Sequence, residues 1–146
     1  MVNPCRMVDK QLSLFGKLLN STPAKMLTSR KKSGNKAEQD ACAYLQKNGL
    51  ILLEKNFLTR AGEVDLIMQD DSMLVFIEVR YRKNTDFGGA AASVTLSKQR
   101  RIIKAALAYQ QKYAPQSSMR FDVIAIEGDN ESIDWIKSAF DGSAYE

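Results

Sequence analysis

Hydrophobic and polar positions follow two different periods along the chain, and each period predicts one kind of element. Apolar residues recur on one face at helical spacing over residues 36–48, and the pair Asn48-Gly49 then predicts the end of a helix. A second helix is predicted from the N-cap candidate Ser97 to about Tyr113, because Ala114-Pro115 does not continue it. Apolar runs bounded by turn residues predict five strands, at residues 50–56, 63–68, 73–82, 120–127 and 133–136.

The order of these elements is helix, three strands, helix and two strands. This order predicts an α/β fold with a mixed five-stranded sheet flanked by helices. Turn residues at 59–62 and 69–72 join the first three strands into an antiparallel meander. The helix between the third and fourth strands predicts a right-handed crossover, so these two strands should run parallel. Residues 84–89 are expected to form a loop.

Charge is distributed unevenly along the 146 residues. Residues 1–36 carry eight basic residues and one acidic residue, whereas residues 37–146 carry thirteen basic and sixteen acidic residues. Helix-breaking residues also interrupt the first thirty or so positions. We therefore expect a basic, mobile extension at residues 1–35 and one folded domain at residues 36–146. A basic arm of this kind is more often solvated than bound to phosphates.

Composition excludes several kinds of site. The chain contains no histidine, so a His-based catalytic triad and a zinc site of the usual kind are excluded. The two cysteines, Cys5 and Cys42, have no metal-ligand spacing. No apolar run approaches the roughly 18 residues that cross a bilayer, so we expect no membrane partner and a cytoplasmic location.

Three carboxylates, Glu63, Asp65 and Glu78, lie in or beside runs that otherwise consist of core residues. Strand alternation places Glu78 and Arg80 on one face, and the neighbouring strand can present Asp65 beside Glu78. Two partly buried carboxylates placed together are unfavourable unless a cation joins them. Mg²⁺, or Mn²⁺, takes such oxygen ligands and activates water for phosphodiester hydrolysis. Arg80 could bind the scissile phosphate through its planar guanidinium group.

The same residues also have a simpler interpretation. Glu78 and Arg80 could form an ion pair on a solvent-facing side of the strand. Asp65 could be a polar residue near a turn, since aspartates are common beside hairpins. Spacing alone favours this alternative over a metal site.

Five segments together resemble the YraN family of bacterial uncharacterised proteins. They are GEVDLI (62–67), VFIEVRYR (75–82), FGGA (87–90), RFDVIAIE (120–127) and IDWIKSAF (133–140). That family is related in fold to Holliday junction resolvases and restriction-endonuclease-like nucleases of the PD-(D/E)XK superfamily. The resemblance covers residues 36–140. It implies a three-layer restriction-endonuclease-like core and a metal-dependent endonuclease that acts on DNA.

The resemblance implies roles for four residues. The metal-binding aspartate of the superfamily matches Asp65, its second acidic ligand matches Glu78, and the helical glutamate of resolvase-like members matches Glu38. The catalytic lysine of the superfamily falls at Arg80, which is a departure. An arginine stays protonated, so Arg80 can bind a phosphate but cannot accept a proton. From its position alone, Glu38 is equally well explained as an exposed glutamate near a helix start.

Basic residues near these carboxylates could line a groove for a nucleic-acid backbone. Three of them recur at every third position near the start of the second predicted helix. The predicted nucleic-acid-binding set is Arg82, Lys83, Lys98, Arg100, Arg101 and Lys104. A solvated helix face is the alternative, and we expect packing rather than base stacking from Tyr81, Tyr109, Tyr113 and Trp135.

These observations lead to two hypotheses and one simpler alternative. The first is a Mg²⁺-dependent endonuclease for DNA, of branched or otherwise structured kind, for which the resemblance to resolvases implies a homodimer. The second is a nucleic-acid-binding module that keeps the nuclease-like fold without the reaction. Arg80 favours the second hypothesis, whereas the retained Asp65 and Glu78 oppose it. The simpler alternative is a structural adaptor with ion-paired carboxylates, and it predicts no response to metal.

Overall fold

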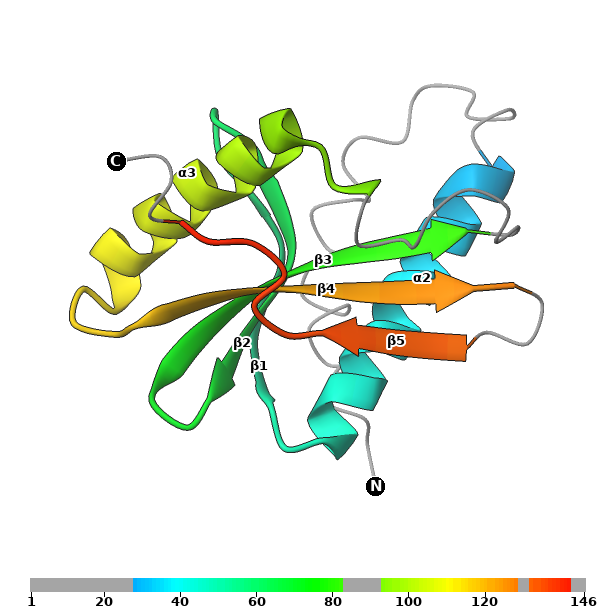
Figure 1. Ribbon diagram of the computed structural model, residues 1–146, viewed down its shortest axis with the longest axis horizontal. Helices are drawn as coiled ribbons and strands as arrows, with labels where there is room; N and C mark the ends of the chain where they lie inside the picture. Colours follow the sequence, from blue (N-terminus) through cyan, green and yellow to red (C-terminus); the bar gives the residue numbers. More distant parts are fainter. Residues whose placement is uncertain (1–27, 83–92, 129–131, 143–146) are drawn as a thin grey trace, which may run out of the picture.

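The computed structural model describes residues 28–82, 93–128 and 132–142, with side chains from residue 34 onward. Most of the basic extension, the predicted loop at 84–89, the FGGA segment and Lys83 lie outside these residues. The described elements follow one another as shown in Figure 1. They are α2 (Thr28–Lys47), β1 (Ile51–Leu58), β2 (Glu63–Asp70), β3 (Met73–Arg82), α3 (Leu96–Tyr113), β4 (Met119–Glu127) and β5 (Ser132–Ile136).

The five strands form one sheet in the order β1-β2-β3-β4-β5. β3 and β4 run parallel, whereas the other neighbouring strands are antiparallel. α3 connects the two parallel strands, because antiparallel neighbours can be joined by a tight turn but parallel neighbours need a crossover. The predicted α/β class, mixed five-stranded sheet and parallel pair are therefore confirmed.

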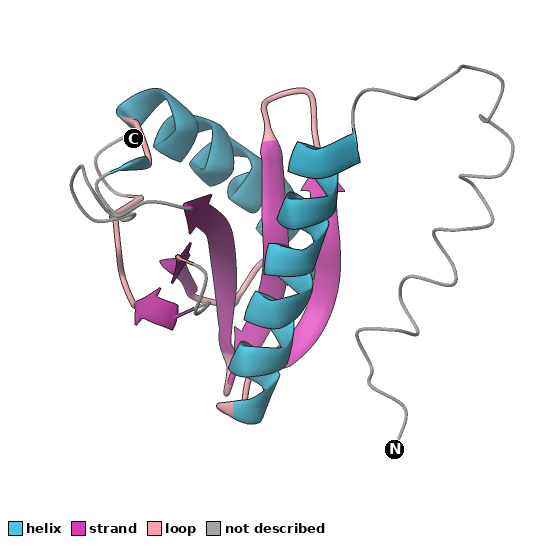
Figure 2. Cartoon of the chain, turned by 90° about the vertical axis from the view of Figure 1, so that its right-hand side faces the viewer, coloured by secondary structure: helices cyan, strands magenta, loops and turns pink. Residues whose placement is uncertain are grey.

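The two helices cover opposite faces of the sheet (Figure 2), and each encloses its own hydrophobic core. Beneath α2, Leu45 packs with strand residues such as Ile77. Beneath α3, Ile102 packs with residues such as Phe76. The result is three layers, consistent with a nuclease-like core. Neither described helix has the length and hydrophobicity needed to span a bilayer.

The predicted end of the first helix and the first turn are confirmed. Gly49 takes a φ of 96°, a left-handed conformation that glycine adopts without a Cβ penalty, directly after α2. In the β1–β2 turn, the Thr59 hydroxyl oxygen accepts hydrogen bonds from the backbone N–H groups of Ala61 and Gly62, each at 3.1 Å. These short polar contacts fix the geometry of the turn that precedes Asp65.

The predicted start of the first helix was wrong. α2 begins at Thr28 and runs through Ser33-Gly34-Asn35, where the sequence suggested breakers. Each of these residues costs up to about 1 kcal/mol in a helix relative to alanine, which is too little to end a helix that continues on both sides. The proposed division into residues 1–35 and 36–146 remains a prediction.

Other boundaries differ by a few residues. The N-cap of α3 is Thr95 rather than Ser97, because the Thr95 hydroxyl oxygen accepts a hydrogen bond from the Lys98 backbone N–H at 3.2 Å. β1 covers residues 51–58 instead of 50–56. β2 continues to Asp70, so the turn to β3 is tighter than the predicted 69–72.

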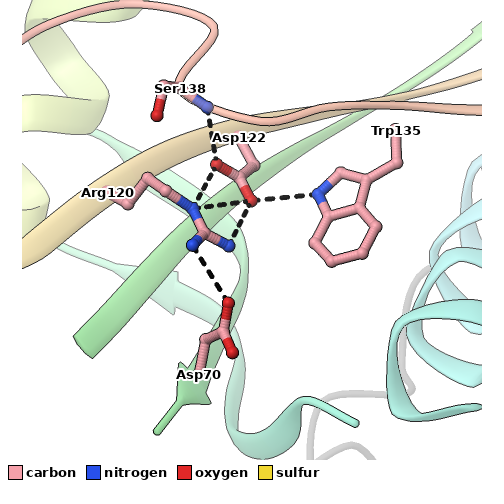
Figure 3. A network of polar contacts seen from close by, with 5 residues as sticks. All are labelled: Asp70, Arg120, Asp122, Trp135 and Ser138. Atoms are coloured by element: carbon pink, nitrogen blue, oxygen red, sulfur yellow. Dashed lines mark hydrogen bonds and ion pairs between the residues drawn. The ribbon is translucent and has the colours of Figure 1, made fainter. Parts of the chain in front are cut away.

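A buried aspartate on β4 joins the end of the described chain to the sheet (Figure 3). The Asp122 side chain is fully buried and accepts hydrogen bonds from Trp135 Nε1 at 2.9 Å and from the Ser138 backbone N–H at 3.0 Å. Arg120 Nε donates to Asp122 Oδ1 at 2.9 Å, and Arg120 Nη1 donates to Asp70 Oδ2 at 3.0 Å. This network links β2, β4 and β5, and its β2 residue, Asp70, lies at the other end of that strand from Asp65.

Candidate functional site

Asp65 lies where the regular pairing of β2 with β3 ends. The pairing reaches Leu66 opposite Ile77, and beyond it the Asp65 carboxylate accepts a hydrogen bond from the Val79 backbone N–H at 2.8 Å. Val64 packs beneath α3 and Leu66 beneath α2. Residues two apart in a regular strand share a face, so β2 is irregular at Asp65. This irregularity places the Asp65 side chain between the two strands.

Glu78 extends from β3 toward α3 and is only 4% exposed. Two cationic groups approach its carboxylate: Arg80 Nε lies 3.3 Å from Oε1, and Lys98 Nζ lies 3.4 Å from Oε2. Neither approach has hydrogen-bond geometry, so the buried Glu78 Oε2 and Arg80 Nε atoms lack a hydrogen-bond partner. A buried charged oxygen without a hydrogen bond is costly, and a cation could satisfy it.

The carboxyl groups of Asp65 and Glu78 contact each other. Burial raises the pKa of Glu78 to about 7, and the negative charge of Asp65 adds to this rise, while Lys98 and Arg80 oppose it. Burial also raises the pKa of Asp65, against the hydrogen bonds that its carboxylate accepts from Val79 N–H and Glu78. Both pKa values are raised because the nearby positive charges do not fully balance the two carboxylates when both are ionised.

The structure brings Glu38 to the same place from the other face of the sheet. Glu38 is half-buried on α2, and burial followed by the charge of Asp65 raises its pKa. A side-chain hydrogen bond from Asn56 and the charge of Lys55 act in the opposite direction. Glu38 on α2 is therefore near enough to Asp65 for the two charges to interact, and a common site for Glu38, Asp65 and Glu78 stays a prediction.

Asn56 and Lys55 are residues that the sequence analysis missed. Both lie on β1, where a short strand pattern gave no reason to single out a polar side chain. Lys55 is only 7% exposed, which is unusual for a lysine unless it interacts with acidic groups. An Asn directly before an aromatic strand residue was the available signal, since Asn tolerates backbone conformations that most residues avoid.

Lys98 reaches Glu78 because α3 lies unusually close to the β1–β2 turn. A Cβ atom placed on Gly62 would lie 2.7 Å from Arg101 Cβ and 3.0 Å from the Arg101 carbonyl oxygen. Only glycine allows this approach. Lys98 precedes Arg101 by one helical turn, so it lies on the same side of α3 and extends toward the sheet.

The other predicted nucleic-acid-binding residues that the structure describes are exposed or partly exposed. Arg100, Arg101 and Lys104 are exposed on α3, and Arg82 is half-buried at the end of β3. Lys83 lies outside the described residues. Among the aromatic residues, Tyr109 is buried in the core beneath α3, as expected for packing, whereas Tyr81 and Tyr113 are exposed. Lys98 itself contacts the buried Glu78 carboxylate.

A divalent cation fits the pair formed by Asp65 and Glu78. Mg²⁺ commonly binds one or two carboxylates and takes its remaining ligands from water and phosphate. Such a cation would satisfy the buried Glu78 Oε2 atom and relieve the repulsion between the two carboxylates. In the described part of the chain, no group of three or more acidic, cysteine or histidine side chains is arranged to hold a metal ion. Glu38 thus contributes charge near the pair without completing a three-residue cluster.

Comparison with known proteins finds one matching family model and several similar proteins. A sequence model of the uncharacterised protein family UPF0102 matches residues 37–126. A UPF0102 protein from Coxiella burnetii is 52% identical over 118 residues, which cover 80% of this chain and 98% of that protein. One from Legionella pneumophila is 52% identical over 110 residues, covering 74% and 93%. One from Nitrosomonas europaea is 48% identical over 118 residues, covering 80% and 100%. The matched region contains Glu38, Asp65, Glu78 and Lys98.

Proposed function

We propose, from the premise that this chain belongs to the uncharacterised protein family UPF0102, that it is a Mg²⁺-dependent endonuclease acting on DNA. The observation that carries the proposal is the buried carboxylate pair Asp65–Glu78, with Glu78 Oε2 lacking a hydrogen bond. Burial of two adjacent carboxylates has no structural benefit in a core of this size, because apolar residues would pack there at lower cost. A bound cation explains their presence.

The residues of the site have separate tasks in this proposal. Asp65, held by the Val79 N–H group, and Glu78 would bind the cation. When bound, Mg²⁺ supplies an activated water and neutralises charge that builds up on the phosphate. Arg80 and Lys98, which both approach Glu78, would attract and orient the scissile phosphate. Arg80 cannot accept a proton, so it has a binding role only.

The DNA backbone would follow the exposed basic residues beside the site. Arg100, Arg101 and Lys104 lie on the outer surface of α3, and Arg82 lies at the end of β3. Phosphate contacts of this kind provide affinity without sequence specificity. The resemblance to resolvase-like nucleases supports branched or structured DNA as the substrate. It also supports a homodimer, since a four-way junction presents two related strands.

The test is a titration of Mg²⁺ and Mn²⁺ into the wild type and the Asp65→Asn/Glu78→Gln variant. Labelled four-way-junction, flap and linear DNA should be incubated with each protein in parallel. We expect metal binding and metal-dependent cleavage by the wild type, and loss of both in the variant. Asp71→Asn is the matched control, because Asp71 is an exposed carboxylate in the β2–β3 turn, at the other end of β2 from Asp65.

A second candidate function is a nucleic-acid-binding module without catalysis. The ion pair between Arg80 and Glu78 favours it, because a permanently charged arginine stands where the superfamily has its catalytic lysine. This candidate predicts DNA binding whose affinity falls with salt, but no cleavage by the wild type or by Arg80→Lys. Cleavage gained in Arg80→Lys would instead show that only the arginine limits the reaction.

A further inference from the structure

The turn between β1 and β2 is closed by hydrogen bonds between its two ends. The Thr59 backbone N–H donates to the Gly62 carbonyl oxygen at 2.8 Å, and the Thr59 hydroxyl group donates to the same oxygen at 3.0 Å. Arg60 lies between these two residues and is exposed. The backbone that carries the Arg60 side chain is therefore restricted, while the guanidinium group can reach a partner outside the protein.

This turn lies against the middle of a row of basic residues on α3. Lys98, Arg101 and Lys104 are three residues apart, so they follow one side of the helix. A Cβ atom placed on Gly62 would lie 2.7 Å from Arg101 Cβ, which shows that the turn touches the row at its central member. Arg60 precedes Gly62 by two residues, at most about 7 Å along the chain. Arg60 therefore adds a fourth positive charge to the row, from a different element.

The row begins at the candidate cation site and leads away from it. Lys98 Nζ lies 3.4 Å from Glu78 Oε2. From Lys98 to Lys104 the helix axis advances by about 9 Å. Successive phosphates of one DNA strand advance by about 3.4 Å along the duplex axis. A strand with one phosphate at Lys98 would therefore bring the next phosphates past Arg101 and the turn.

The positive charge of this surface is poorly balanced within the protein. α3 contains five basic residues and no acidic residue, and three of the basic residues lie in its first two turns, nearest the positive end of the helix dipole. Arg60, Arg101 and Lys104 form no ion pair with any residue that the structure describes. The acidic residue closest to the turn in sequence, Glu63, is a single charge. Helix stability does not explain such an arrangement, whereas a polyanionic partner does.

We propose that the β1–β2 turn is a second DNA-contacting element, in which Arg60 and Arg101 bind a backbone phosphate next to the one at the Asp65–Glu78 pair. The inference rests on the proposed function, since DNA is the partner in both, and it adds Arg60 to the residues that contact the DNA. Phosphate contacts of this kind fix the register of the strand rather than read its sequence. Because the turn is packed against α3, they also set the direction in which the strand crosses the site.

The test measures the salt dependence of DNA binding by fluorescence anisotropy. Labelled four-way-junction DNA is titrated with each protein without a divalent cation, so that no metal-dependent cleavage occurs. Arg60→Ala should bind about fivefold more weakly at low salt. The slope of log affinity against log salt concentration should fall by about one, because one phosphate contact is lost. Arg60→Lys keeps the charge and should keep the slope of the wild type.

Lys47→Ala is the matched control, because it also removes one exposed positive charge. Lys47 ends α2, at the other end of β1 from the turn, so its removal should leave the slope unchanged. An Arg60→Ala slope equal to that of the wild type would overturn the inference, and so would an equal decrease in Lys47→Ala. The thermal stability of Arg60→Ala should equal that of the wild type, since the hydrogen bonds of the turn come from Thr59.

A Mn²⁺ titration separates this inference from the proposed reaction. Arg60→Ala should bind Mn²⁺ as tightly as the wild type, because Arg60 is outside the Asp65–Glu78 pair. Weaker Mn²⁺ binding would mean that the substitution acts through the cation site, which would overturn the inference. A wild type that binds DNA but never cleaves it would refute the proposed reaction, while the slopes would still decide the task of Arg60. Absence of DNA binding by the wild type would refute both.

Discussion

Each acidic side chain of the site interacts with a polar or cationic group that restricts its position. Val79 N–H binds Asp65, Lys98 and Arg80 approach Glu78, and Asn56 binds Glu38. These contacts reduce the cost of the buried charges but do not remove it, since the pKa values of all three carboxyl groups are raised. The site is therefore most stable when it holds an additional positive charge, either a proton or a cation.

The raised pKa of Glu78 predicts a pH-dependent stability. Burial and the Asp65 charge raise this pKa from 4.5 to about 7 in the folded protein, so the folded state holds the proton more tightly than the unfolded state. The resulting stabilisation is complete below pH 4.5 and is lost as the pH rises through about 7. The difference is on the order of 3 kcal/mol. Urea unfolding of the metal-free protein should show it.

Glu78→Gln removes this titration and supplies the comparison. We expect the free energy of unfolding of Glu78→Gln to change less than that of the wild type between pH 4.5 and 8. Asp71→Asn, which changes an exposed carboxylate in the β2–β3 turn, should retain the wild-type profile. A Glu78→Gln profile as steep as that of the wild type would contradict the assignment of this pH dependence to Glu78.

Among the secondary-structure elements, the contact between the β1–β2 turn and α3 determines whether Lys98 reaches Glu78. Gly62 allows this contact, since an added Cβ would meet Arg101 Cβ at 2.7 Å and its carbonyl oxygen at 3.0 Å. The backbone of α3 cannot move away without moving Lys98. A change at Gly62 is therefore transmitted to the site through the position of the helix.

Gly62→Ala should destabilise the protein and weaken metal binding. Overpacking of this kind typically costs about 1–3 kcal/mol, and here it displaces α3 from the turn. Thermal unfolding and Mn²⁺ titration measure the two effects. Gly34→Ala is the control: an added Cβ meets nothing within 4 Å, and alanine in place of glycine in a helix should stabilise α2. A Gly62→Ala variant as stable as Gly34→Ala would contradict the close contact.

The sequence predicted the elements better than it predicted the contacts between them. β3 covers residues 73–82 as predicted, because the apolar run Met73–Ile77 after a turn, continued by apolar and polar residues in alternation, is typical of a strand. The start of α2 was missed because local propensities of Ser33-Gly34-Asn35 are weaker than the continuation of the helix.

For the site, strand alternation placed Asp65 beside Glu78. It could not reveal the left-handed Asn56 or the approach of Lys98, because both depend on packing between distant segments.

In the whole molecule, the site collects residues from both outer layers of the fold. Glu38 comes from α2 on one face of the sheet and interacts with Asp65, whereas Lys98 comes from α3 on the other face and contacts Glu78. A second buried polar cluster has a structural task. There the Asp122 network joins β5 and the segment after it to β4 (Figure 3).

Asp122→Asn should destabilise the fold strongly. It removes the charge that pairs with Arg120 in a fully buried position, and breaking such a pair typically costs about 3–5 kcal/mol. Urea unfolding followed by the fluorescence of Trp135, which donates a hydrogen bond to Asp122, measures the loss. Asp70→Asn breaks the more exposed ion pair with Arg120, so its cost should stay below about 1 kcal/mol. Equal losses in the two variants would contradict the central position of Asp122.

The parallel pairing of β3 with β4 has a consequence for synthesis on the ribosome. Leu74 pairs with Met119, which is translated 45 residues later. At about 5–20 residues per second, roughly 2–9 seconds pass before β4 exists. During this interval one edge of β3, whose first five residues are all apolar, has no neighbour. The nascent chain is therefore most susceptible to aggregation, and most in need of a chaperone, after β3 has emerged and before β4 follows.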